Sequence, residues 1–120
     1  MKIAFTTPGE SLDAPLDPRF GRAARFLIYD DEAKRIELLE NAQNLDAAQG
    51  AGIQAARHLA EADVDRLITG DCGPKAFRVL REAGIAVHLC DQATIADAYD
   101  RFKAGELPET DAPNAESHWI

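Results

Sequence analysis

Short apolar runs alternate with amphipathic stretches along this chain, and the alternation predicts an α/β domain. Lys2–Thr7 is a nearly continuous apolar run that stops at a Pro-Gly pair, as a buried strand does. Arg25–Asp30 has a similar composition, whereas Arg35–Glu40 alternates apolar and charged residues in the manner of a half-exposed edge strand. Only a short polar turn separates these two runs, so we expect them to form an antiparallel hairpin.

Three helices are expected in the second half of the chain. Residues 48–62 are rich in alanine and place apolar residues on one stripe, which suits close packing on a sheet. Pro74 is well placed as the first residue of a second helix, which Gly84 ends. Thr94 begins a third helix with a capping box, and Gly105 closes it.

Two further apolar runs, at 66–69 and 86–90, are expected to be the fourth and fifth strands. Strands joined by a helical crossover run parallel to each other, so the pattern predicts a mixed sheet covered by helices. Residues 106–120 contain two prolines and several acids. We therefore expect an irregular tail there, after a single domain of residues 1–105.

The charge balance narrows the classes of partner. Thirteen basic and 21 acidic residues give a net charge of -8, which disfavours nucleic acid because binding it requires neutralising phosphates. No apolar stretch has the length of a membrane span, so no membrane partner is expected. The start, MKIAF, lacks the long apolar segment of a signal peptide, and we expect a cytoplasmic location.

The stretch ITGDCGPKAF places a thiol, Cys72, between two glycines where a strand gives way to a helix. Ligands of open α/β sheets bind at the carboxyl ends of parallel strands, where helix N-termini point at them. The positive end of the helix is expected to lower the pKa of Cys72 and to favour an anionic ligand. The alternative is that the glycines only form a turn and Cys72 fills space. The same edge is expected to collect the 8–24 connection, Gly50 and Gly52 at the first helix, the 70–73 turn and Cys90.

Several segments resemble the dinitrogenase iron-molybdenum cofactor family: MKIAFTT, DPRFGRAARFLIYD, the pattern ITG-x-x-GP-x-AF, and FKAGEL with APNAESHW. The resemblance implies a ribonuclease H-like three-layer α/β/α fold, with a five-stranded mixed sheet of order 3-2-1-4-5 and strand 2 antiparallel. It also implies a small non-enzymatic protein that holds or carries an iron-sulfur or molybdenum-containing cluster, or its precursor. A cofactor-assembly or recipient protein would then be its partner, and the chain would be a monomer or a small homo-oligomer.

The resemblance also implies a set of site residues. His118 matches the histidine of the family's GHW tail, although Ser117 stands here in place of the glycine. Cys72, Cys90 and His118 are the expected metal ligands. The expected cofactor-binding residues are Arg19, Phe20, Gly21, Arg22, Gly50, Gly52, Asp71, Cys72 and Gly73.

Most of these residues also have a purely structural interpretation. The two arginines complement an anionic cluster, or they pair with Asp13 and Asp17 of their own loop. Cys90 shares a strand face with His88 and so offers a pair of metal ligands, or both are core residues. His118 is expected either to dock over the edge of the sheet or to lie in a frayed terminus.

Two other functions remain open from the sequence. A thiol redox or regulatory module would use Cys72 and Cys90 and act through a protein partner, although the chain has no C-x-x-C motif. A metal-dependent nuclease is suggested by the ribonuclease H-like fold. That chemistry needs clustered carboxylates, and the runs KIAFTT and RLIT contain no acid.

Overall fold

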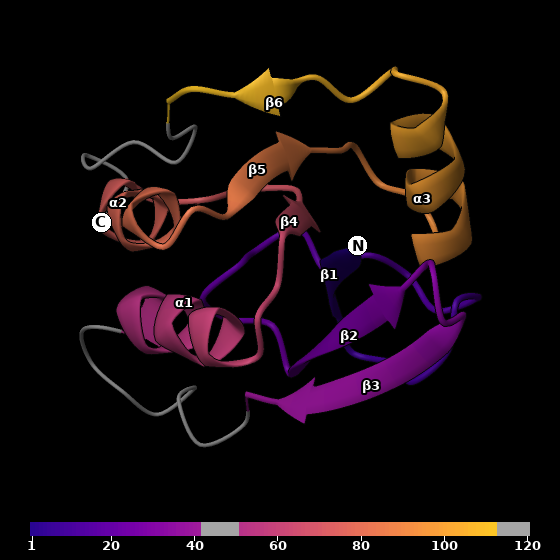
Figure 1. The fold of residues 1–120 in the computed structure, drawn as a ribbon, viewed down its shortest axis with the longest axis horizontal. Coiled ribbons are helices and arrows are strands. Elements are labelled where there is room, and N and C mark those ends of the chain that lie inside the picture. The colour runs from indigo at the N-terminus through magenta and orange to yellow at the C-terminus, as the bar shows by residue number, and fades with distance from the viewer. Residues whose placement is uncertain (42–50, 113–120) are drawn as a thin grey trace.

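The structure is a computed structural model, and it describes residues 1–41 and 51–112. Its elements follow the alternation expected from the sequence (Figure 1). In chain order they are β1 (Lys2–Thr7), β2 (Arg25–Asp30), β3 (Arg35–Glu40), α1 (Ala51–Glu61), β4 (Arg66–Thr69), α2 (Pro74–Glu82), β5 (Ala86–Leu89), α3 (Ile95–Lys103) and β6 (Glu109–Thr110).

The strands form one mixed sheet of order β3-β2-β1-β4-β5-β6. β1 pairs antiparallel with β2 and parallel with β4, and β4 pairs parallel with β5. The hairpin of β2 and β3 is antiparallel, with Asp30 opposite Arg35. The arrangement of the first five strands is therefore the expected one, because each helical crossover returns the chain in the same direction.

The expectation of five strands was wrong, because β6 adds a sixth. β6 pairs antiparallel with β5, with Val87 opposite Thr110 and His88 opposite Glu109. It lies in the segment that was expected to be irregular. A strand of two residues is too short to show an alternating sequence pattern. β6 is a strand because it pairs with the edge of β5.

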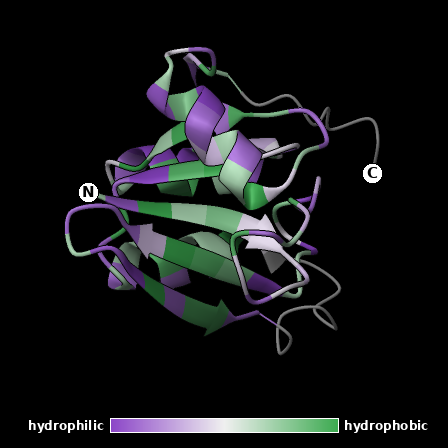
Figure 2. Cartoon of the chain, turned by 90° about the vertical axis from the view of Figure 1, so that its right-hand side faces the viewer, coloured by the Kyte–Doolittle hydropathy of each residue, from purple (hydrophilic) through white to green (hydrophobic). Residues whose placement is uncertain are grey.

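Helices cover both faces of the sheet. α1 and α2 pack on one face, where Phe26, Leu59 and Leu80 belong to a single buried cluster. α3 packs on the other face, in a cluster that includes Phe5 and Ile95. Figure 2 shows α3 standing in front of the sheet, which makes the domain a three-layer α/β/α structure.

The helix ends follow the signals in the sequence. Pro74 is the first residue of α2, and Gly84 follows the helix with φ 80°. The Thr94 side chain accepts a hydrogen bond from the Asp97 N–H (3.1 Å), as a capping box requires. Gly105, with φ 79°, follows α3. Within residues 1–41 and 51–112, no helix is both long and apolar enough to cross a bilayer.

Candidate functional site

The carboxyl ends of β1, β4 and β5 lie along one edge of the sheet, because these strands are parallel. We call this edge, with the connections 8–24, 70–73 and 90–94 that leave it, the carboxyl edge. A Cβ built on Gly52, near the start of α1, would lie 3.1 Å from the Cβ of Ala76 in the first turn of α2. The starts of these two helices therefore approach each other closely.

Buried threonines fix the longest of these connections to the sheet. Thr6, Thr7 and Thr69 are fully buried at the ends of β1 and β4. The Thr6 hydroxyl donates to the Asp17 carbonyl (2.6 Å) and the Thr7 hydroxyl to the Pro15 carbonyl (2.8 Å). Sequence reasoning did not single these residues out, although the signal was present: polar residues at the ends of two adjacent buried strands.

The structure brings the RFGR loop and the 70–73 turn together. The Phe20 N–H donates to the Asp71 carbonyl (3.2 Å), and Arg19 and Asp71 form an isolated parallel bridge. A Cβ on Gly70 would lie 2.8 Å from the backbone of Pro18, so only glycine allows this approach. Two segments about fifty residues apart in sequence therefore form one surface.

The residues of the RFGR loop divide between the core and the surface. Phe20 is 2% exposed, and its ring lies 5.4 Å from the ring of Phe26, so its side chain anchors the loop in the core. Gly21 is half-buried, whereas Arg19 and Arg22 are exposed. The Arg19 guanidinium has no ion-pair partner among the described residues, and only its backbone N–H contacts Asp17 Oδ1 (3.0 Å).

Cys72 lies beneath the carboxyl edge rather than on it. Its side chain is 1% exposed and belongs to the core cluster of α1 and α2, with Sγ 3.8 Å from the Gly73 carbonyl. Burial raises the pKa of the Cys72 thiol to about 12. The expectation of a lowered pKa was wrong, because desolvation of the thiolate outweighs the effect of the helix N-terminus.

Cys90 lies on the opposite face of the sheet, in the cluster of α3. A hollow of about 260 Å³ at the carboxyl edge is lined by Leu16, Pro18, Cys90, Asp91 and Gln92. Burial raises the pKa of Cys90, and Arg101 Nη1, 3.9 Å from Sγ, opposes the rise. Since the two cysteines belong to clusters on opposite faces, the structure does not bring them together as a redox pair.

His88 is a core residue with both ring nitrogens engaged. Nδ1 lies 2.7 Å from the Leu107 carbonyl, and Nε2 lies 3.0 Å from Arg66 Nη1. A carbonyl only accepts and a guanidinium only donates, so the ring is neutral with its proton on Nδ1. Phe102 stacks edge-on against the ring, and burial lowers the pKa of His88. His88 therefore holds the segment before β6 and is not available beside Cys90 as a ligand.

The remaining candidates divide as follows. Gly50 and His118 lie outside the described residues. Gly73 precedes α2 with φ -74°, and a Cβ there would meet nothing within 4 Å. In the part of the chain that the structure describes, no group of three His, Cys, Asp or Glu side chains is arranged to hold a metal ion.

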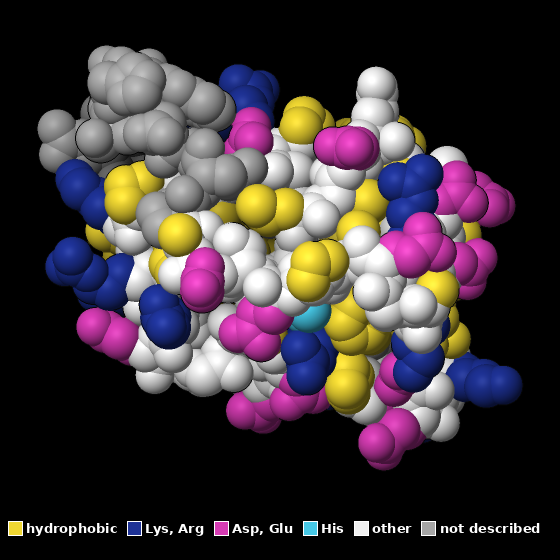
Figure 3. Space-filling model, turned by 90° about the horizontal axis from the view of Figure 1, so that it is seen from above, with side chains coloured by type: hydrophobic (Ala, Val, Ile, Leu, Met, Phe, Trp, Pro, Cys, Tyr) yellow, Lys and Arg dark blue, Asp and Glu magenta, His cyan; other side chains and the backbone are white. Residues whose placement is uncertain are grey.

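A larger hollow, of about 640 Å³, opens at the other edge of the sheet. Its lining mixes both signs of charge, with Arg66 and Arg81 beside Asp65 and Glu109. Seen from the β6 side, basic and acidic side chains are also interspersed over the surface (Figure 3). None of the carboxyl-edge connections reaches this hollow, so we do not assign the predicted site to it.

Comparison with known proteins shows the family to which this chain belongs. Residues 1–105 match the family described as dinitrogenase iron-molybdenum cofactor, and the chain belongs to this family. An uncharacterised protein of Methanocaldococcus jannaschii is 32% identical over 110 residues, which cover 89% of each chain.

Two solved structures are similar over nearly the whole chain. The apo form of the orange protein from Desulfovibrio gigas is 41% identical, with a TM-score of 0.92 over 95% of this chain and 96% of that one. A NifB-like protein from Thermotoga is 32% identical, with a TM-score of 0.81 over 95% and 98% of the two chains. These similarities point to a small cluster-binding or carrier protein.

Proposed function

We propose that this protein holds or carries an iron-sulfur or molybdenum-containing cluster, or its precursor, without catalysing its turnover. The observation that carries the proposal is the junction of the RFGR loop with the 70–73 turn at the start of α2. Such a junction, in which a loop with two exposed arginines contacts the turn that leads into a helix N-terminus, suits an anionic metal-sulfide cargo.

The cargo is held mainly by charge and backbone hydrogen bonds. Cys72 is buried and carries its proton at neutral pH, so binding metal through it would require both exposure and deprotonation. The open space above Gly73 lets a bulky anion approach the backbone at the start of α2. A preformed cluster, complete in its own sulfur ligands, needs little more than these contacts.

The test is anaerobic titration of the metal-free protein with tetrathiomolybdate and, separately, with ferrous iron and sulfide. Visible absorption and the metal retained after desalting are the readouts. Arg19→Gln/Arg22→Gln should lower retention about tenfold, because charge-assisted contacts to the anion are lost. The matched control is Arg57→Gln/Arg78→Gln, which removes the same charge from exposed positions on α1 and α2.

Three single variants locate the cargo further. Gly73→Ala should lower retention if the cluster contacts the backbone at the start of α2. Cys72→Ala and Cys90→Ala decide whether either thiol is a ligand, since the two lie on opposite faces of the sheet. Failure of the native protein to retain metal from either source would overturn the proposal, and so would equal retention by the arginine pair and its control.

The proposal extends to the domain, the location and the partner of the protein. Residues 1–105 form the carrier domain, which works in the cytoplasm and exchanges its cargo with a cofactor-assembly or recipient protein. The tail histidine, His118, and the ribonuclease H-like fold assignment stay predictions from the resemblance. A redox or nuclease function has less support, because the thiols are separated and the described residues hold no three-carboxylate group.

A further inference from the structure

The outer edge of β3 presents an unpaired row of backbone hydrogen-bonding groups. β3 pairs with β2 on one side and ends the sheet, so among residues 1–41 and 51–112 no strand pairs with its other side. An exposed edge of this kind is a template for pairing with another strand. β3 has six residues and contains neither proline nor glycine, so nothing in its backbone blocks such pairing.

The same strand exposes two large apolar side chains. Ile36 is 45% exposed and Leu38 is 38% exposed, and both point to the α3 side because they pair with Tyr29 and Leu27 of β2. α3 stands over the middle of the sheet and leaves this end of it uncovered (Figure 2). The edge therefore combines backbone groups that no described strand pairs with and an apolar face. A partner strand that covered both would be bound by main-chain hydrogen bonds and by apolar contacts.

The charges of β3 favour a second copy of the same strand as that partner. Two β3 strands can pair antiparallel about a two-fold axis perpendicular to the sheet. If this axis passes beside Ile36, Arg35 of each copy lies opposite Glu37 of the other copy, which gives two contacts between opposite charges. Ile36 then faces its own equivalent. An axis beside Glu37 would instead place the Glu37 carboxylates of the two copies opposite each other. An axis beside Leu38 would place Ile36 of one copy opposite Glu40 of the other.

In the part of the chain that the structure describes, Arg35 and Glu37 have no ion-pair partner that would compete with these contacts. Arg25 and Glu40, at the other end of the hairpin, do form an ion pair (2.8 Å). We propose that the protein self-associates through antiparallel β3–β3 pairing centred on Ile36, with reciprocal Arg35–Glu37 contacts between the two copies. The pairing involves one short strand and a net charge of -8 on each copy, so the dimer is weak.

Sedimentation equilibrium of the metal-free protein tests this proposal, and its result does not depend on cluster binding. The weight-average mass should rise toward twice that of the chain as the concentration approaches about 1 mM at physiological salt. Arg35→Glu and Glu37→Arg should each lower the association constant about tenfold, because like charges then face each other. The double variant Arg35→Glu/Glu37→Arg should restore association.

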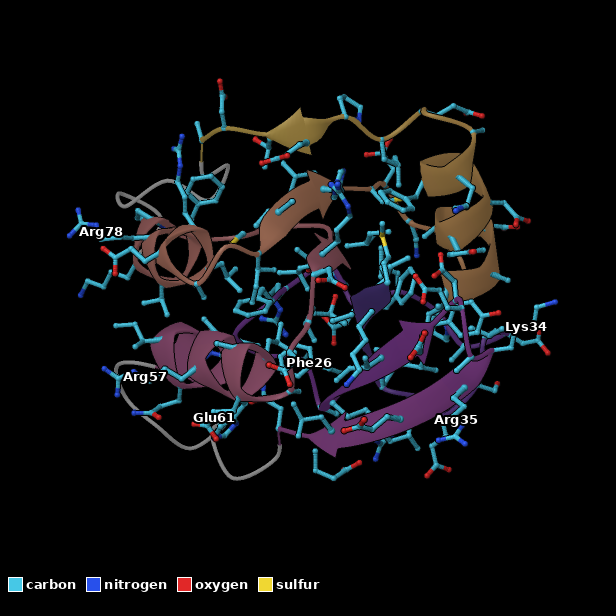
Figure 4. The ribbon with its side chains drawn as sticks, in the orientation of Figure 1. Phe26, Lys34, Arg35, Arg57, Glu61 and Arg78 are labelled. Carbon is cyan, nitrogen blue, oxygen red and sulfur yellow. The ribbon has the colours of Figure 1, made fainter. Side chains whose placement is uncertain are left out.

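Matched controls separate local pairing from total charge. Arg78→Glu on α2 and Glu61→Arg on α1 make the same charge changes at exposed helix positions and should leave association unchanged. In Figure 4 these two residues lie towards the left of the view, whereas Arg35 lies towards the right. Urea midpoints of all variants confirm that each folds. A native protein that stays monomeric throughout would overturn the proposal, as would association that the β3 variants do not weaken or the double variant does not restore.

Discussion

The hydroxyl groups of Thr6 and Thr69 are hydrogen-bonded to each other (2.9 Å) where β1 and β4 end side by side. Thr6 also donates to the Asp17 carbonyl (2.6 Å). This buried contact couples the two central parallel strands to the loop that carries Arg19. The position of this loop therefore depends on a buried hydroxyl group of β1.

Replacing Thr6 by valine should destabilise the fold by about 1–3 kcal/mol, because it leaves the partly buried Asp17 carbonyl without this donor at a nearly unchanged side-chain volume. Urea unfolding measures the loss. Thr110→Val is the matched control, since the Thr110 hydroxyl bonds the Ala112 carbonyl in an exposed turn. If both variants lost the same free energy of unfolding, the buried Thr6 contact would stabilise the fold no more than an exposed one.

Gly70→Ala should destabilise the protein by about 1–3 kcal/mol, because the added Cβ would lie 2.8 Å from the Pro18 backbone. Gly73→Ala should change the free energy of unfolding by less than about 0.5 kcal/mol, since its φ is -74° and nothing lies within 4 Å. Thermal or urea unfolding of the pair compares two glycines of one turn. A larger loss at Gly73 than at Gly70 would contradict the packing described above.

The Cys72 thiol should make stability fall at high pH. Its pKa is raised from 9.0 to about 12 in the folded chain, so the folded state holds the proton more tightly than the unfolded state. The contribution is fully present below the unfolded pKa and is lost as pH rises toward the folded one. Urea midpoints at about pH 8 and about pH 10 should drop more for the native protein than for Cys72→Ala. Equal drops would mean that the thiol is not desolvated in the folded chain.

Asp31 should make stability fall at low pH. Its carboxylate accepts from the Met1 amino group (2.9 Å) and from the Tyr99 hydroxyl (3.3 Å), and these contacts hold its pKa below the ordinary value of 3.8. The stabilisation is present at neutral pH and is lost as pH falls through the lowered pKa. Asp31→Asn should thus be less stable than the native protein near neutrality, and the difference should vanish in acid.

Unfolding midpoints at about pH 7 and at a series of acidic values down to about pH 2 measure this difference. Glu61→Gln is the control, because it removes one negative charge from an exposed position on α1. A difference between Asp31→Asn and the native protein that persists in acid would point to packing rather than charge.

The features of this fold that depend on local sequence were predictable from the sequence alone. The runs that became β1 to β5, and the caps at Thr94, Gly84 and Gly105, were readable because they depend on local patterns and local backbone conformation. The parallel direction of the strands joined by helices also followed from the pattern, because helical crossovers return the chain in the same direction. The order of the first five strands was implied by the family resemblance, and the sheet has that order. The resemblance to the family held over residues 1–105.

The properties that depend on distant neighbours were not readable in this way. β6 exists only because β5 offers a free edge, and the Cys72 pKa is set by core side chains from α1 and α2 rather than by its own loop. Phe20 was expected at the ligand edge and turned out to be a core anchor, because Phe26 provides a ring for it to pack against. The sequence by itself determined which segments are strands, helices and turns. Only the tertiary structure decided which side chains are buried and which thiol lies on which face, because burial is a property of the assembled chain.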